Sequence, residues 1–123
     1  MQHHPGFLRL VQDALSRVPE VSLEDTLAAL ARDPRTVVLD VREESEWAAG
    51  HIPGARHLGK GVIERDIEHV VPDPATPVIL YCGGGYRSAL AGDALQKMGY
   101  QDVRSMAGGW RAFQAHRDAH RTG

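Results

Sequence analysis

The chain has 123 residues, of which 42% are apolar and 24% are charged, and its formal net charge at pH 7 is -2. These values fit one compact domain with one core and exclude a broad basic surface for nucleic acid. The only cysteine, Cys82, excludes an internal disulfide. Polar and charged residues interrupt the apolar ones near the N-terminus, so we expect no signal peptide and no membrane span. We therefore expect a cytoplasmic protein whose thiol stays reduced.

Helices and strands are predicted to alternate along the first half of the chain. Apolar residues at helical spacing predict an amphipathic helix over residues 7–18, ending before Pro19. Ser22 is suited to cap a second helix that ends near Asp33. Residues 36–41 are short, β-branched and apolar, as buried strands are. A short helix, a small strand and a further helix are expected at 43–49, 55–58 and 62–70.

The same alternation continues in the second half. Residues 78–81 form a strand that runs into the segment 82–88, and the apolar positions after Ser88 trace a helix that Gly99 ends. A short strand at 102–105 and a terminal helix from Trp110 complete the pattern. Alternating elements predict an α/β domain with a small, mainly parallel sheet and helices on both faces. We divide the chain into an N-terminal helical extension (1–20), this domain (21–115) and a polar tail (116–123).

The segment that follows the strand 78–81 combines the residue types of an anion-binding nucleophile. Cys82 stands at the carboxyl end of the strand, where open α/β sheets bind ligands. Three consecutive glycines allow backbone N–H groups to converge on one centre, and the next helix adds its positive end. These groups and the cation of Arg87 should lower the pKa of the thiol. The alternative, a buried inert thiol beside a tight turn, does not require this combination.

Three motifs of the chain resemble those of the rhodanese family. The first runs from Asp40-Val41-Arg42-Glu43 through Glu46-Trp47 to the turn at 50–55, the second is the loop 82–88, and the third is Gly108-Gly109-Trp110. The match extends from about residue 21 to 113 and implies a rhodanese-like fold. It also implies an enzyme of the thiosulfate sulfurtransferase type, which moves a sulfane sulfur to cyanide or a cellular thiol through a persulfide on Cys82.

The resemblance also implies roles for the other residues of these motifs. The backbone of the loop would hold the sulfur, Arg87 would lie near the anionic donor, and Tyr86 would form part of the pocket wall. Asp40 and Arg42 would support the site, with Arg42 pairing with a helix carboxylate such as Glu46. The substrate-binding residues expected are Gly83, Gly84, Gly85, Tyr86, Arg87 and Ser88.

Other functions of the same loop stay open. The persulfide could serve as a sulfur carrier for a dedicated protein partner, or the domain could be a non-catalytic regulatory module. Related phosphatases place five residues between cysteine and arginine, whereas four separate Cys82 from Arg87. This tighter loop favours sulfur over a tetrahedral phosphate, so phosphatase and arsenate reductase chemistry rank lower.

Cofactors and partners follow from the same reasoning. Sulfur would be carried covalently, without a cofactor or a metal. His116 and His120 have the spacing of two helical ligands, but no third ligand is near them in sequence, so we interpret them as solvated tail residues. We expect a small sulfur donor and a thiophilic acceptor, with a thioredoxin-like or sulfur-relay protein as a candidate partner. No nucleic acid or membrane is expected, and the chain would be a monomer or a weak homodimer.

Overall fold

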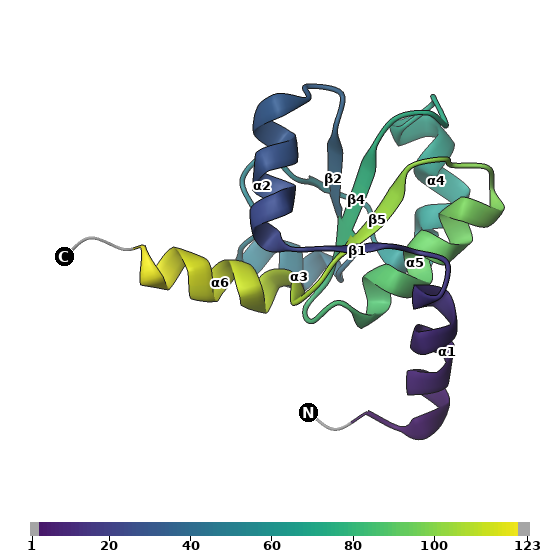
Figure 1. Cartoon of the computed structure of the whole chain (residues 1–123), viewed down its shortest axis with the longest axis horizontal. Helices are drawn as coiled ribbons and strands as arrows, with labels where there is room; N and C mark the ends of the chain where they lie inside the picture. The colour runs from purple at the N-terminus through teal and green to yellow at the C-terminus, as the bar shows by residue number, and fades with distance from the viewer. Residues whose placement is uncertain (1–2, 121–123) are drawn as a thin grey trace.

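The computed structural model describes residues 3–120 of the chain. Within this range a parallel five-stranded sheet has the order β1-β5-β4-β2-β3 (Figure 1). The strands are β1 (Glu20–Val21), β2 (Val37–Asp40), β3 (Arg56–His57), β4 (Val78–Tyr81) and β5 (Val103–Met106). The helices are α1 (Pro5–Leu15), α2 (Leu23–Arg32), α3 (Glu44–Ala49), the 3-10 helix η1 (Lys60–Val62), α4 (Ile63–Val70), α5 (Tyr86–Lys97) and α6 (Gly109–Ala119).

Helices cover both faces of the sheet, and each face has its own apolar core. Figure 1 shows α4 and α5 on one side of the strands and α2 and α6 on the other. On the first side, Ile63, Ile67 and Leu95 pack on strand residues such as Leu80. On the second side the cluster contains Leu23, Leu27, Trp110, Phe113, Val38, Ile79 and Tyr81. The core strands are apolar without alternation because they are covered on both faces.

The register of the two central strands brings their carboxyl ends to one edge of the sheet. Asp40 at the end of β2 pairs with Tyr81 at the end of β4. The segment after Asp40 therefore lies beside the segment that begins with Cys82, and the Val41 N–H donates to the Tyr81 carbonyl over 3.0 Å. A ligand site built from both segments belongs at this edge, as in other open α/β sheets.

The expected α/β fold with a parallel sheet is confirmed, and four details differ. The first helix begins at Pro5, whose fixed φ suits the first turn, and ends at Leu15, short of the expected residue 18. Strand β1 has only two residues, too few to give a recognisable strand pattern in the sequence. It is identified as a strand by its parallel pairing with β5. Helix α5 already begins at Tyr86, and α6 continues to Ala119 into the segment expected to be a tail. Residues 121–123 of that tail lie outside the described range.

Helix α1 packs on its own domain. Its buried residues Val11 and Ala14 contact Ala89 of α5. After the helix, Arg17 donates to Asp93 of α5, with 2.7 Å between Nε and Oδ1. The apolar stripe expected for this helix is thus covered by α5, and Leu10 points outward with 60% of its surface exposed. Among the helices of residues 3–120, none is long and apolar enough to cross a membrane.

Candidate active site

The sulfur of Cys82 lies at the end of β4 and is surrounded by hydrogen-bond donors. The residue is 1% exposed. The Gly85 N–H lies 3.1 Å from Sγ, the Ser88 N–H lies 3.4 Å from it, and the Ser88 hydroxyl oxygen lies 3.5 Å from it. Ser88 Oγ in turn lies 2.8 Å from Ser105 Oγ of β5. The sulfur therefore occupies a small cradle made of two amides and a hydroxyl that a second hydroxyl orients.

This cradle lowers the pKa of Cys82. Burial raises the pKa of the thiol, but the hydrogen bonds from the Ser88 hydroxyl and from the amides of Ser88, Gly85 and Gly84 outweigh it. When the thiol is protonated it donates to Ser88 Oγ, and after ionisation the hydroxyl turns to donate to the thiolate. The lowered pKa of Cys82 agrees in direction with the sequence prediction. A thiolate that is stabilised in this way can act as a nucleophile.

The start of helix α5 lies inside the expected loop and explains the cradle geometry. Gly85 is the N-cap with φ +104°, a left-handed conformation that glycine adopts without strain. The chain can therefore turn sharply after Gly84 and direct the first amides of α5 at the sulfur. Ser88 is in the first turn of the helix rather than in the loop, so its amide lacks a helical partner and is free to bind the sulfur.

Helix α6 fixes the loop from behind. The Trp110 N–H donates to the Cys82 carbonyl over 2.7 Å, and the Arg111 N–H donates to the Gly83 carbonyl over 3.2 Å. The approach is so close that a Cβ at Gly109 would overlap the Cys82 carbonyl, and Gly109 has φ +51°. The closing Gly-Gly-Trp motif therefore has a physical role: it lets the first amides of α6 bind the loop carbonyls, which leaves the loop amides facing the sulfur.

Arg87 forms an ion pair with Glu46, the carboxylate that the sequence analysis expected to pair with Arg42. Its two terminal nitrogens donate to Glu46 of α3 over 2.8 and 3.1 Å. The hydrogen bonds from Arg87 lower the pKa of Glu46 to about 2. The Arg87 charge still acts on Cys82, but the carboxylate of Glu46 in the bidentate ion pair offsets part of it.

Arg42 pairs with Asp40, so the expected Arg42–Glu46 contact is wrong. Arg42 Nη2 lies 2.7 Å from Asp40 Oδ2 and 2.6 Å from the Gly50 carbonyl. Both charged side chains are buried, and the guanidinium lies over the ring of Trp110 with 4.8 Å to its centre. Asp40 is only two residues earlier in the chain than Arg42, and this proximity explains why the two side chains pair. The pair joins β2, the turn after α3 and α6, and we retain the supporting role as a proposal.

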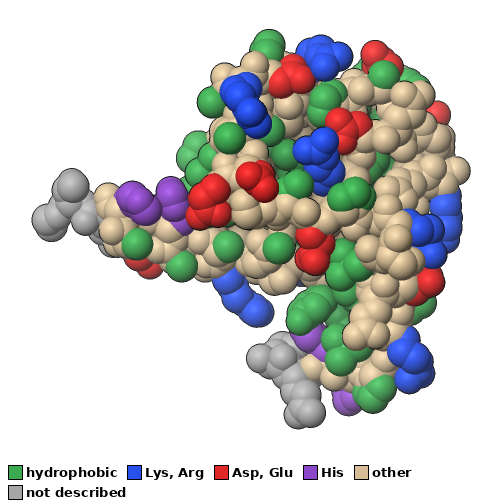
Figure 2. All heavy atoms as spheres, viewed as in Figure 1, with side chains coloured by type: hydrophobic (Ala, Val, Ile, Leu, Met, Phe, Trp, Pro, Cys, Tyr) green, Lys and Arg blue, Asp and Glu red, His purple; other side chains and the backbone are tan. Residues whose placement is uncertain are grey.

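A cavity of about 300 Å³ opens above the sulfur. Arg111 of α6 lines one side, while His3 and Phe7 lie on the side of α1, beside Tyr86. Figure 2 shows this notch between α6 and α1, with a basic side chain on the α6 side and histidine and apolar side chains across from it. Sequence reasoning predicted Tyr86 in the wall but missed the other three. The described lining residues are His3, Phe7, Cys82, Gly83, Gly84, Tyr86, Arg87 and Arg111.

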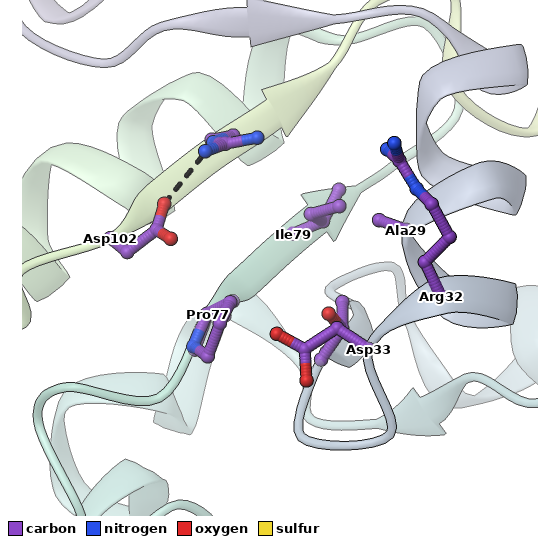
Figure 3. Close-up of a pocket in the computed structure, with 9 residues that line it drawn as sticks. Ala29, Arg32, Asp33, Pro77, Ile79 and Asp102 are labelled. Atoms are coloured by element: carbon purple, nitrogen blue, oxygen red, sulfur yellow. Dashed lines mark hydrogen bonds and ion pairs between the residues drawn. The ribbon is translucent and has the colours of Figure 1, made fainter.

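A second cavity lies at the opposite, amino ends of the strands. It has a volume of about 200 Å³ and lies between the end of α2 and the starts of β4 and β5 (Figure 3). Its polar side chains include Asp33 and Arg104, which are already paired with Arg35 and Asp102. No cysteine or histidine is among its described lining residues, so we do not assign it to the chemistry. Within residues 3–120, no three potential ligands are grouped for a metal ion.

The parallel sheet and the thiolate cradle define an α/β protein with an activated cysteine at a strand end. The family model of the Rhodanese-like domain matches residues 23–116. The thiosulfate sulfurtransferase GlpE of Pseudomonas putida is 37% identical over 97 residues, covering 79% of this chain and 82% of that protein. The chain belongs to the rhodanese-like family. These comparisons confirm the expected family and the expected class of enzyme.

Further relatives differ in what their names state. The putative sulfur carrier protein YrkF of Bacillus subtilis is 31% identical, and the match spans 78% of this chain but only 51% of that protein. Human TSTD1, a single-domain sulfurtransferase, has a TM-score of 0.70 at 27% identity and covers 80% of this chain and 96% of that one. A protein of unknown function from Rhodopseudomonas palustris, described as a possible tyrosine phosphatase, has a TM-score of 0.77 at 30% identity and covers 97% and 94%.

Proposed function

We propose that the chain transfers a sulfane sulfur from a small anionic donor such as thiosulfate to a thiophilic acceptor through a persulfide on Cys82. The observation that carries this proposal is the ring of donors around Sγ. The thiolate attacks the outer sulfur of thiosulfate, the S–S bond of the donor breaks, and sulfite leaves with the electron pair. Cyanide or a thiolate then takes the outer sulfur and restores the Cys82 thiolate.

The geometry supports both halves of this cycle. A thiol whose pKa is lowered by its cradle depends less on a general base, and among the described residues that line the cavity there is no carboxylic acid. After loading, the negative charge moves to the outer sulfur, which extends from the floor of the cradle into the cavity, within reach of an acceptor. The proposed domain for this chemistry is 21–115, with residues 1–20 as an extension. A reactive free thiol fits a reducing compartment, so we propose a cytoplasmic location.

A sulfur carrier is the second candidate, because the relative YrkF is named as one. A carrier uses the same cradle but discharges only to a dedicated protein. The name of the Rhodopseudomonas palustris neighbour raises phosphatase chemistry, but the four residues between Cys82 and Arg87 disfavour it. The intact cradle counts against a purely regulatory module.

Intact-mass measurement after incubation with thiosulfate tests the proposal directly. We expect a gain of about 32 mass units, one sulfur, that cyanide removes with release of thiocyanate. Cys82→Ser should show neither. Failure to load from thiosulfate and from polysulfide would refute sulfur transfer. Loading that small acceptors cannot discharge, but a thioredoxin-like protein can, would favour the carrier.

A further inference from the structure

Two arginines line the cavity above Cys82, and they differ in whether a carboxylate is already bound to them. Arg87 is held by the two oxygens of Glu46. Arg111 takes part in none of the ion pairs found among residues 3–120. Arg87 still acts on Cys82 but shares its charge with Glu46, whereas the charge of Arg111 is not offset by a carboxylate in the described part of the chain.

The backbone of α6 places Arg111 accurately. Its N–H is bonded to the Gly83 carbonyl, so the residue is attached to the cysteine loop itself. Its guanidinium lies directly over Gly84: a Cβ built there would be 3.3 Å from Nη1. A side chain at Gly84 would be in steric contact with this guanidinium. Because residue 84 is glycine, the guanidinium can reach a molecule bound in the cavity beside the sulfur.

The opposite wall of the cavity is aromatic and is supplied by the N-terminal segment. His3 stacks edge-on against Tyr86 with 4.7 Å between ring centres, and Phe7 lies 6.1 Å from the same ring. The imidazole of His3 and the hydroxyl of Tyr86 can donate hydrogen bonds on this side, but only the opposite side has the permanent charge of a guanidinium from Arg111. The charge asymmetry orients a donor: its anionic end belongs on the Arg111 side and its sulfane sulfur on the Cys82 side.

We propose that Arg111 is the anion-anchoring residue of the donor site and that it selects small sulfane-sulfur donors with an anionic oxygen-bearing end. This proposal rests on the proposed sulfur transfer for the identity of the donor. Arg111 would bind the oxygens of thiosulfate while the thiolate attacks the outer sulfur, and it would then hold the sulfite that leaves. No residue of the cradle changes its role, because the anchor acts on the far end of the donor.

Steady-state kinetics with thiosulfate and cyanide test the anchor. We expect Arg111→Gln to raise KM for thiosulfate about tenfold, equivalent to about 1.4 kcal/mol, with kcat changed less than about twofold, since the Coulomb contact is lost on binding. Arg111→Lys should restore part of the affinity, because the charge returns without the planar fork. Arg65→Gln, an equal charge change at a residue 74% exposed on α4, is the matched control and should leave KM unchanged. An unchanged KM in Arg111→Gln overturns the proposal.

Alkylation of the single cysteine gives a second readout that needs no sulfur transfer. Iodoacetate and iodoacetamide have nearly the same shape and differ in charge, so the ratio of their rates at Cys82 reports the field in the cavity. We expect Arg111→Gln to lower the iodoacetate-to-iodoacetamide ratio about fivefold or more relative to wild type and Arg65→Gln. If wild type loads no sulfur, the proposed function fails while this ratio still decides the anion site. An equal ratio in all three proteins overturns the anchor.

Discussion

Replacing Ser88 by alanine removes one of the groups that stabilise the Cys82 thiolate and leaves the loop backbone unchanged. The lost contact joins Ser88 Oγ to Sγ over 3.5 Å. A hydrogen bond to a charged group contributes about 1.5–3 kcal/mol, and the long distance places this one at the low end. About 1.5 kcal/mol corresponds to a factor of roughly ten in the ionisation constant of the thiol. The pKa of the thiol should rise, since the charged form loses a stabilising donor.

The rate of iodoacetamide alkylation as a function of pH measures this effect. Cys82 is the only cysteine, so every adduct reports this site. We expect the midpoint of the pH profile to move upward by about one pH unit in Ser88→Ala, with slower alkylation below that midpoint. Ser105→Ala is the matched control, because it keeps the Ser88 hydroxyl and removes only its 2.8 Å neighbour, so a smaller change is expected. A midpoint that does not move in a folded Ser88→Ala protein refutes the assigned role of the hydroxyl.

Three further changes test the elements around the cradle. The pKa of Glu46 falls from 4.5 to about 2 on folding, so the stability it contributes is present above pH 4.5 and is lost as the pH falls toward 2. Its carboxylate is about one-third exposed, so solvent screening reduces its contribution to the free energy of unfolding to about 1 kcal/mol. In urea unfolding, Glu46→Gln should lower the stability by this amount at pH 7 and should leave it unchanged at pH 2. Gly109→Ala should destabilise the protein by more than about 1 kcal/mol and slow alkylation of the cysteine, whereas Gly61→Ala, where a Cβ meets open space, should do neither. Phe7→Ala should open the cavity and speed alkylation by a bulky maleimide severalfold, while the outward-facing Leu10→Ala leaves that rate unchanged; equal rates in both variants would argue against the α1 wall.

Much of the fold and the nucleophile was predictable because the signals are local. The strand 78–81, the glycine run and the helix after it are contiguous, so Cys82 and its lowered pKa follow from the order of residues. The cap of Ser22 on α2 is equally local, and the Asp25 N–H donates to the Ser22 hydroxyl as predicted.

The partners of the charged side chains were not predictable in the same way. Glu46 and Arg87 are far apart in the chain and meet only when α3 docks beside α5. Arg111 had no motif to mark its function, and its position above the loop depends on how α6 packs against Cys82 and Gly83. Local sequence signals therefore named Arg87 but did not find Arg111, and they did not decide which charged side chains are paired with each other.

The docking of α6 on the loop carbonyls has a consequence for synthesis of the protein. Cys82 is translated well before Trp110 and Arg111, whose amides hold the loop in shape. A nascent chain that ends before α6 carries the cysteine and its donors without the two amides that bind the loop carbonyls, so we expect its thiol to be less activated than in the complete domain. The shape of the nucleophile's loop therefore depends on a segment that follows it by more than twenty residues, and we expect a chain truncated ahead of α6 to be alkylated more slowly at Cys82 although every residue of the loop is present.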